Sequence, residues 1–384
     1  MKNMWELLKI CVTKTPWRKI INFIPIYKPG KPIEEVKREL GLDNVVKLAS
    51  NENAMDPSPK VVEAIASEAK KVNRYPDGWC FYLRKALSEK LSIDEDNLIF
   101  GNGSDELISL ALRAFVERGD EVVIADPTFL IYRLASVIAG AKVRLVPLKD
   151  YKYDLKGMLK AVNSRTKVIF IANPDNPTGS YVTQQELDEF IEKVPKDILI
   201  FLDEAYYEFA VGGDYPESIG LIKREDRNII ITRTFSKAYG LAGLRVGYGI
   251  ARKDLMMAIN KAREPFNVNS LAQAAAIAAL DDDEYRDASV ALIREGKEKL
   301  YKKFDSLGIK YIPSKTNFIL LETNRDSTQV FEAILKKGVI IRDISPWGLK
   351  GCIRVNIGLP EENEMFLKAF EEVLKEIPEI KETA

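Results

Sequence analysis

The feature that most constrains the fold is an alternation of short apolar runs and longer helical patterns from about residue 98 onward. The runs are rich in β-branched residues and carry few polar ones, as expected for strands buried on both faces of a sheet. Alternation of this kind predicts an α/β domain with a mostly parallel sheet. The predicted strands are residues 98–100, 121–125, 142–146, 167–172, 198–202, 228–232 and 245–250, and the predicted helices between them are 105–117, 130–139, 155–162 and 184–194.

The pattern differs on either side of this region. Four prolines punctuate residues 1–35, which predicts an N-terminal arm with one short amphipathic helix. After residue 265 come two helical stretches at 271–280 and 289–307, short strand patterns at 310–312, 317–321, 339–342 and 352–357, and a C-terminal helix. We therefore expect an arm (1–35), a large domain (36–265) and a smaller α+β domain (266–384) that packs with part of the N-terminal segment.

Composition narrows the chemistry. None of the 384 residues is a histidine, which excludes Ser-His-Asp and Cys-His nucleophile systems and the HExxH zinc site. Lysine, carboxylate, tyrosine or cysteine must therefore carry the proton transfers of any enzyme built on this chain. The 57 basic and 57 acidic residues leave no overall basic excess of the kind that indicates nucleic-acid binding.

Cysteine usage and apolar-run length predict the compartment. Cys11, Cys80 and Cys352 are far apart and odd in number, which fits neither a disulfide framework nor a metal knuckle. The run at residues 7–12 is broken by a lysine and lacks a clear cleavage site, so we do not expect a signal peptide. No stretch approaches the length of a transmembrane helix. We expect a cytoplasmic protein without a membrane partner.

Polar clusters follow four of the predicted strands. They are Gly101–Glu106, Asn173–Gly179, Asp203–Tyr206 and the segment from Arg233 to Lys237, which continues to Gly240, Gly243 and Arg245. Each alone has an ordinary explanation, such as a tight turn, a helix cap, a surface lysine or an ion-pair partner. Ligands of open α/β sheets bind beyond the carboxyl ends of the strands, so the coincidence of four clusters predicts one site. No metal is expected there, because histidine is absent and carboxylates are few.

Together these clusters offer a partner for each functional group of pyridoxal 5′-phosphate. Lys237 can form a Schiff base with an aldehyde if its amine is partly neutral. Asp203 suits a protonated pyridine nitrogen, and Asn176 and Tyr206 can hydrogen-bond the phenolic oxygen. Phe129, after another predicted strand, offers a ring for stacking. The expected phosphate donors are Gly103, Ser104, Thr234, Ser236 and Arg245, and Asp105 is also expected in the cofactor site.

Nine strings in order, between about residues 27 and 374, carry a resemblance to a known family. The chain resembles the fold type I pyridoxal-phosphate-dependent aminotransferases of class II, and within them it is similar to the group that acts on histidinol phosphate. The strings are Pro29–Pro32, Ala49–Asn53, Asn73–Gly78, Gly101–Glu106, Asn173–Gly179, Asp203–Tyr206, Thr234–Arg245, Pro265–Asn269 and Ile353–Val355.

The resemblance implies further roles. Lys237 would hold the cofactor covalently and then move a proton between the substrate carbon and the cofactor C4′ carbon. Tyr75 would reach the cofactor phosphate of a second subunit, which implies a homodimer. Arg354 would bind the glutamate carboxylate in one half-reaction and the substrate phosphate in the other, and Tyr27 and Asn51 would line the substrate pocket. The implied reaction converts L-histidinol phosphate and 2-oxoglutarate to imidazole acetol phosphate and glutamate, a step of histidine biosynthesis.

Three segments depart from the family pattern. Asn53–Asp56 replaces an Asn-Pro-Leu-Gly string, Trp79 replaces a small residue, and Pro346–Lys350, with Trp347, replaces a Gly-Tyr-Gly-Leu-Pro string. The two tryptophans are either ordinary variation at a rim or a shift of preference toward aromatic amino acids.

Three alternative functions share the same cofactor residues. The first is an aromatic amino acid aminotransferase. The second is a decarboxylase of a phosphorylated amino acid, which would release carbon dioxide and need no 2-oxoglutarate. The third is a non-catalytic cofactor-binding regulator, which would require a DNA-binding domain, and the segment before residue 35 is too short for one and carries no helix-turn-helix signal.

Overall fold

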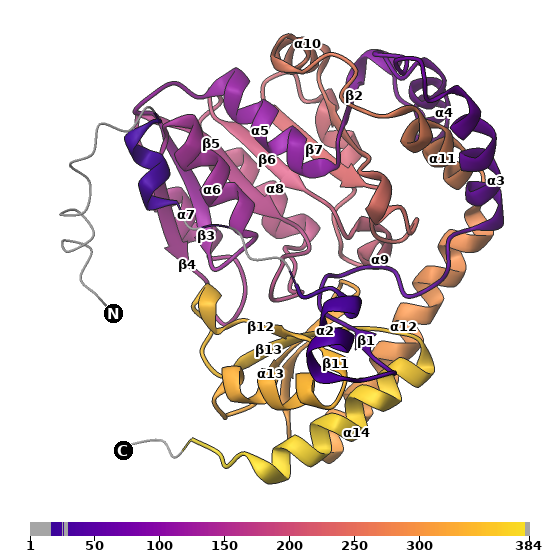
Figure 1. The fold of residues 1–384 in the computed structure, drawn as a ribbon. Coiled ribbons are helices and arrows are strands. Elements are labelled where there is room, and N and C mark those ends of the chain that lie inside the picture. The colour runs from indigo at the N-terminus through magenta and orange to yellow at the C-terminus, as the bar shows by residue number, and fades with distance from the viewer. Residues whose placement is uncertain (1–16, 25, 27–29, 381–384) are drawn as a thin grey trace.

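A computed structural model describes residues 17–24, 26 and 30–380 (Figure 1). Its larger sheet has seven strands in the order β2-β8-β7-β6-β5-β3-β4. Neighbouring strands from β7 to β4 are parallel, whereas β8 runs antiparallel to both β2 and β7. The strands are β2 (Leu98–Gly101), β3 (Glu121–Asp126), β4 (Lys142–Pro147), β5 (Thr166–Ala172), β6 (Leu199–Asp203), β7 (Asn228–Thr234) and β8 (Gly247–Ala251). The predicted α/β class with a mostly parallel sheet is confirmed.

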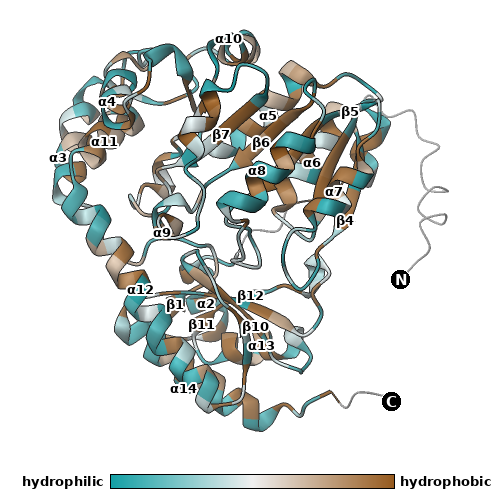
Figure 2. Cartoon of the chain, turned by 180° about the vertical axis from the view of Figure 1, so that it is seen from behind, coloured by the Kyte–Doolittle hydropathy of each residue, from teal (hydrophilic) through white to brown (hydrophobic). Residues whose placement is uncertain are grey.

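The sheet is the centre of the main hydrophobic core. Residues of β5, β6 and β7 are buried almost without exception, and Figure 2 shows these strands as apolar bands between helices whose outer sides are hydrophilic. Strands with apolar side chains on both faces need helices packed on each face, because these helices shield the apolar side chains from water. The helices are α5 (Ser104–Phe115), α6 (Leu130–Ala139), α7 (Leu155–Ala161), α8 (Gln184–Lys193) and α10 (Lys253–Ala262), with a separate group of α3 (Pro59–Glu68), α4 (Phe81–Leu91) and α11 (Ser270–Leu280).

A second unit lies below the large sheet in Figure 1. Its four strands pair in antiparallel fashion in the order β12-β13-β10-β9, and its core is a separate apolar cluster. β1 (Val46–Lys47) pairs with β11 (Val339–Ile340) beside α2 (Ile33–Leu40), so a segment near the N-terminus belongs to this unit. The remaining elements are β9 (Lys310–Ile312), β10 (Phe318–Glu322), β12 (Arg342–Asp343), β13 (Cys352–Asn356), α12 (Asp283–Ser306), α13 (Ser327–Lys336) and α14 (Pro360–Glu376).

Several predicted elements differ from the structure. α12 begins at Asp283, six residues before the predicted start at 289, because Asp283 and Glu284 favour the positive end of a helix dipole. The predicted strand 339–342 is two strands, β11 and β12, in two different sheets. In the arm, Lys19–Phe23 forms a 3₁₀ helix, and residues 1–16 lie outside the described residues. None of the helices in the described part of the chain has the length and apolar character needed to cross a membrane.

Glu121, at the start of β3, joins three segments at the edge of the large sheet. Its carboxylate accepts hydrogen bonds from Arg144 Nε (2.6 Å), Asn163 Nδ2 (2.7 Å) and Arg165 Nε (3.0 Å). These donors, above all Arg144, lower the pKa of Glu121 to about 2. Because the folded-state pKa lies below the unfolded value, the stabilisation is present above about pH 4.5 and is lost as the pH falls toward 2.

We expect Glu121→Gln to lower the free energy of unfolding by about 2 kcal/mol at pH 7, the scale of hydrogen bonds to charged groups. The deficit should shrink as the pH falls through the window above. Urea unfolding at pH 7 and at pH 3 measures it. Asp94→Asn removes an exposed carboxylate that pairs with Lys253 and should change stability by less than about 0.5 kcal/mol. A deficit that does not depend on pH would contradict this electrostatic explanation.

Candidate active site

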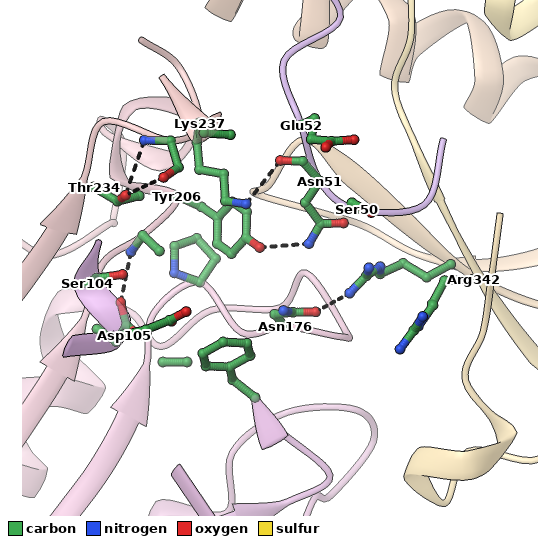
Figure 3. Close-up of a pocket in the computed structure, with 18 of the residues that line it drawn as sticks. Ser50, Asn51, Glu52, Ser104, Asp105, Asn176, Tyr206, Thr234, Lys237 and Arg342 are labelled. Atoms are coloured by element: carbon green, nitrogen blue, oxygen red, sulfur yellow. Dashed lines mark hydrogen bonds between the residues drawn. The ribbon is translucent and has the colours of Figure 1, made fainter. Parts of the chain in front are cut away.

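The polar clusters of the sequence meet in one pocket between the two units (Figure 3). β2, β5, β6 and β7 are mutually parallel in direction, so their carboxyl ends lie at one edge of the sheet. β8 runs the opposite way, and Arg245 therefore reaches the same edge from its amino end. The cavity has a volume of about 330 Å³, within the range of small-molecule sites. The predicted residues that line it are Asn51, Ser104, Asp105, Phe129, Asn176, Asp203, Tyr206, Thr234, Ser236, Lys237, Arg245 and Arg354.

Lys237 follows β7 and points its amine into the pocket (Figure 3). Nζ donates to the Asn51 carbonyl oxygen at 3.1 Å and lies 5.5 Å from the centre of the Tyr206 ring. Desolvation by the pocket walls, helped by the nearby Arg354 guanidinium, lowers the pKa of Lys237 to about 8. A lysine in this state is partly neutral near pH 7 and can act as a nucleophile or a base.

The backbone of Lys237 is also fixed from outside its own strand. Asn53 Nδ2 donates to the carbonyl oxygens of Lys237 and Ala238, each at 3.2 Å, and to Ser289 Oγ on α12 at 2.9 Å. Asn53 ends one of the family strings, but nothing in the sequence indicates this anchoring role. The lysine is thus held between the large sheet, the 49–53 segment and α12.

Asp203 ends β6 with its carboxylate buried beneath the pocket. Oδ2 accepts a hydrogen bond from Tyr132 Oη at 2.6 Å, and Oδ1 accepts longer ones from the Ala205 amide (3.2 Å) and Thr232 Oγ1 (3.3 Å). Burial raises the pKa of Asp203 to about 6, with Asp105 adding to the rise and the hydrogen bonds opposing it. Sequence reasoning missed Tyr132, although its position three residues after Phe129 would place both on one face of a helix.

A chain of polar side chains closes the opposite wall. Asn51 Nδ2 donates to Tyr206 Oη at 2.7 Å, and the Asn51 backbone adopts a left-handed conformation with φ of 55°. Arg354, on β13 of the smaller unit, donates to Asn176 Oδ1 and, at 2.8 Å, to the Ala49 carbonyl oxygen. Burial raises the pKa of the Tyr206 hydroxyl, so this hydroxyl remains a neutral donor at physiological pH.

The remaining end of the pocket is rich in hydrogen-bond donors. Gly103 (φ 78°) precedes α5, whose amino terminus therefore opens toward the Arg245 guanidinium. The positive φ favours glycine at this position, and a Cβ atom there would lie 2.5 Å from Arg245 Nη2 and displace the guanidinium. Thr234 Oγ1 donates to Ser236 Oγ at 3.0 Å, and Arg245 Nη2 lies 3.6 Å from Asp105. A helix amino terminus with an arginine and two hydroxyls is a site for a phosphate.

Some predicted residues do not line the pocket of this single chain. Tyr75 is 83% exposed and stacks on Phe266 with ring centres 4.8 Å apart. Trp79 is exposed and lies near Arg263, away from the cavity, whereas Trp347 lines it. Tyr27 lies outside the described residues. Arg342, which lines the pocket in Figure 3, had no signal in the sequence beyond its place in a predicted strand.

The donor set fits pyridoxal 5′-phosphate. At one end of the pocket, the amino terminus of α5 after Gly103 can bind the phosphate dianion. At the other end lie the partly neutral Lys237 and the buried Asp203 carboxylate. Within the described residues, Asn51 Oδ1 is a buried acceptor without a hydrogen-bond partner, which a ligand donor would satisfy. Such an orphaned acceptor in a polar cavity indicates a ligand.

Comparisons with known proteins agree with this chemistry. The family model for class I and II aminotransferases matches residues 43–370. The histidinol-phosphate aminotransferase of Moorella thermoacetica is 46% identical over 93% of this chain and 92% of its own length. Histidinol-phosphate aminotransferase 2 of Carboxydothermus hydrogenoformans is 47% identical over 93% of this chain and 99% of its own length.

Solved structures show the same fold. The histidinol-phosphate aminotransferase of Sinorhizobium meliloti, solved in complex with pyridoxal-5′-phosphate, is 30% identical with a TM-score of 0.86, over 95% of this chain and 99% of that chain. The resemblance seen in the sequence is therefore confirmed. The chain belongs to the class I and II aminotransferase family and is an aminotransferase.

Proposed function

We propose that this chain uses pyridoxal 5′-phosphate to transfer the amino group of L-histidinol phosphate to 2-oxoglutarate, giving imidazole acetol phosphate and glutamate. The observation that carries the chemistry is the partly neutral Lys237 in one pocket with the buried Asp203 carboxylate. The substrate rests on the relatives of that name, which are 46–47% identical over more than nine-tenths of the chain. The step belongs to histidine biosynthesis, and we propose that the enzyme works in the cytoplasm.

The residues of the pocket divide into four tasks. Lys237 Nζ would be the point of covalent attachment, and the Asp203 carboxylate would accept a hydrogen bond from a pyridine N–H. Asn176 and Tyr206 would bind the ring oxygen, and Phe129 would stack on the ring. Gly103, Ser104, Thr234, Ser236 and Arg245 would hold the phosphate. When bound, pyridoxal phosphate supplies an electron sink that stabilises negative charge at the substrate carbon.

Lys237 moves the proton. Its free amine would take a proton from the substrate carbon as a base and return it later as an acid, and the pKa of about 8 suits both roles near neutral pH. The Asn51 carbonyl, 3.1 Å from Nζ, holds the amine inside the pocket. An ordinary lysine with a pKa near 10.5 would stay protonated and could not begin this cycle.

The wall formed by the smaller unit recognises anions. Arg354 and Arg342 both line the cavity, and Trp347 lies beside both guanidinium groups at about 6 Å. The two substrates share a negative group, a phosphate in one and carboxylates in the other, and a planar guanidinium can bind either in bidentate fashion. Alternate use of one arginine by both substrates is consistent with a single pocket.

We also propose a homodimer. Five large aromatic side chains, all exposed in the single chain, lie near the α4–α11 side: Tyr75, Trp79, Phe81, Tyr82 and Phe266. Exposed apolar patches of this kind mark interaction surfaces. In the dimer Tyr75 would extend to the phosphate end of the neighbouring pocket. Sedimentation of the purified protein as a monomer would refute this part of the proposal.

The substrate is tested by single-turnover kinetics on one preparation. L-Histidinol phosphate, phenylalanine and tyrosine are each mixed with the cofactor-loaded enzyme, and conversion of the cofactor from its aldehyde to its amine form is followed by absorbance. We expect histidinol phosphate to react at least about tenfold faster, because its phosphate carries more negative charge and more acceptor oxygens for the arginines than the single carboxylate of phenylalanine or tyrosine. Faster conversion by phenylalanine would favour the aromatic alternative, for which Trp347 in the wall is the structural argument. A phosphorylated amino acid such as O-phospho-L-threonine is added as a fourth compound, and release of carbon dioxide from it without 2-oxoglutarate would indicate the decarboxylase.

A further inference from the structure

Tyr132 is a buried tyrosine that touches two components of the pocket. It lies in the first turn of α6 and is 1% exposed. Its hydroxyl donates to Asp203 Oδ2 at 2.6 Å. Its ring stacks on Phe170 of β5 with centres 4.8 Å apart, and it meets the Phe129 ring edge to face at 5.5 Å. The position of the tyrosine is therefore fixed by packing and not by its hydrogen bond.

The bond to Asp203 stands out among the contacts of that carboxylate. In the part of the chain that the structure describes, Tyr132 is the one donor to Oδ2, and the two donors to Oδ1, Thr232 and the Ala205 amide, lie at 3.2 Å or beyond. An O–H donor at 2.6 Å to an ionised acceptor is in the range of a strong hydrogen bond. Tyr132 thus contributes most to the orientation of this carboxylate.

Asp203 needs such support. Burial disfavours its ionised form and the Asp105 charge adds to that effect, while the hydroxyls of Tyr132 and Thr232 and the Ala205 amide favour ionisation. A carboxylate that is to keep a pyridine nitrogen protonated must itself remain ionised. The chain has no imidazole for this purpose, and a tyrosine whose own pKa is raised by burial stays a neutral O–H donor.

We propose that Tyr132 is a positioning residue of the cofactor site. Its hydroxyl orients Asp203 toward the pyridine nitrogen, and its aromatic ring supports Phe129 against the face of the pyridine ring. This inference rests on the proposed cofactor function. Tyr132 acts through Asp203 and Phe129 and takes no part in bond making or breaking.

Tyr132→Phe tests the proposal, since it keeps the ring and removes only the hydroxyl. Three properties are measured on the purified protein: the dissociation constant for pyridoxal phosphate, the pH midpoint of the absorption change of the lysine-bound cofactor, and kcat against KM. We expect cofactor affinity to fall about tenfold, the loss expected for one hydrogen bond to a charged group. kcat should fall by a similar factor with little change in KM.

The pH midpoint distinguishes a positioning role from a merely structural one. Positive charge on the pyridine nitrogen lowers the pKa of the nearby imine nitrogen by like-charge repulsion. If Asp203 holds the pyridine proton less firmly in Tyr132→Phe, that charge is weaker and the midpoint moves to higher pH. A loss of packing alone would lower thermal stability and leave the midpoint where it is in the unmodified protein.

Tyr153→Phe is the matched control. Tyr153 is also a buried tyrosine beside the sheet, but its hydroxyl bonds to Thr128 Oγ1 and the Ala172 amide and not to Asp203. It should lose stability without a shift of the midpoint. An equal shift in both variants, or no change of affinity and midpoint in a folded Tyr132→Phe protein, would overturn the inference.

Two further outcomes are decisive. If Tyr132→Phe does not fold, Thr232→Val removes another hydroxyl from the same carboxylate and should shift the midpoint in the same direction by a smaller amount. No shift in that variant would also overturn the inference, because hydrogen bonds to Asp203 would then not govern the site. Failure of the unmodified protein to bind pyridoxal phosphate would instead refute the proposed function itself.

Discussion

Replacement of Lys237 by alanine is expected to lower the rate of amino-group transfer by at least about 10⁴-fold, at or beyond the upper end of the contribution of a general acid–base group. The variant loses both the covalent anchor and the proton carrier, and no other described lysine lines the pocket. Steady-state transamination, with cofactor added in excess, measures the loss.

A labelling experiment identifies the anchoring lysine directly. Borohydride should fix the cofactor to the lysine that bears it, and peptide mapping should recover the label on Lys237. Lys297 is a demanding control, because burial also lowers its pKa to about 8 while it donates to the Ser314 and Thr316 carbonyls outside the pocket. Recovery of the label on Lys297 would show that basicity alone, and not the pocket, selects the lysine.

The same lysine predicts a pH profile for cofactor capture. The neutral amine is the nucleophile, and a pKa of about 8 leaves about one amine in ten neutral at pH 7. The rate at which cofactor-free protein takes up pyridoxal phosphate should therefore rise as the pH increases toward 8 and level off above it. A rate that keeps rising to pH 10 would indicate an ordinary solvated lysine.

Arg354→Ala should lower kcat/KM for both L-histidinol phosphate and glutamate by about 100-fold or more. The variant removes a bidentate, charge-assisted contact that each substrate uses in its own half-reaction. Arg354→Lys keeps the charge without the planar fork and should recover only part of the loss. Cofactor affinity serves as the control for an intact site, since Arg354 also donates to Asn176. Unchanged kinetics with both substrates would reject the dual role.

The parts of the fold that follow from burial could be predicted from the sequence. β5, β6 and β7 are apolar on both faces, so their runs indicate a sheet covered by helices, and the polar residues directly after them must lie at one edge. Asp203 and Lys237 lie together for this reason. β3 was predicted in the same way, and Phe129 follows it into the pocket.

Other features depend on pairing partners that a sequence does not specify. β8 returns antiparallel to β7 because residues 235–246 between them contain no crossover α-helix, and an antiparallel strand inside the sheet has the same apolar pattern as a parallel one. Tyr132 in α6 donates to Asp203, which is 71 residues away in the sequence, and no sequence motif links the two. Arg342 reaches the pocket because residues 339–343 divide between two sheets, a division that apolar periodicity does not reveal. The role expected for Tyr75 depends on a second chain and stays a prediction.

The left-handed backbone at Asn51 has a consequence for engineering. Its carbonyl oxygen accepts hydrogen bonds from Lys237 Nζ at 3.1 Å and from Asn317 Nδ2, directly before β10, also at 3.1 Å. The two donors come from different units of the fold. Asn317, which does not line the pocket, therefore helps to fix the carbonyl oxygen that aligns the Lys237 amine. Small misplacements of a reacting group are costly to rate. Laboratory evolution of new substrate preferences should therefore select substitutions around Asn317, a position that screens restricted to the cavity walls would leave unsampled.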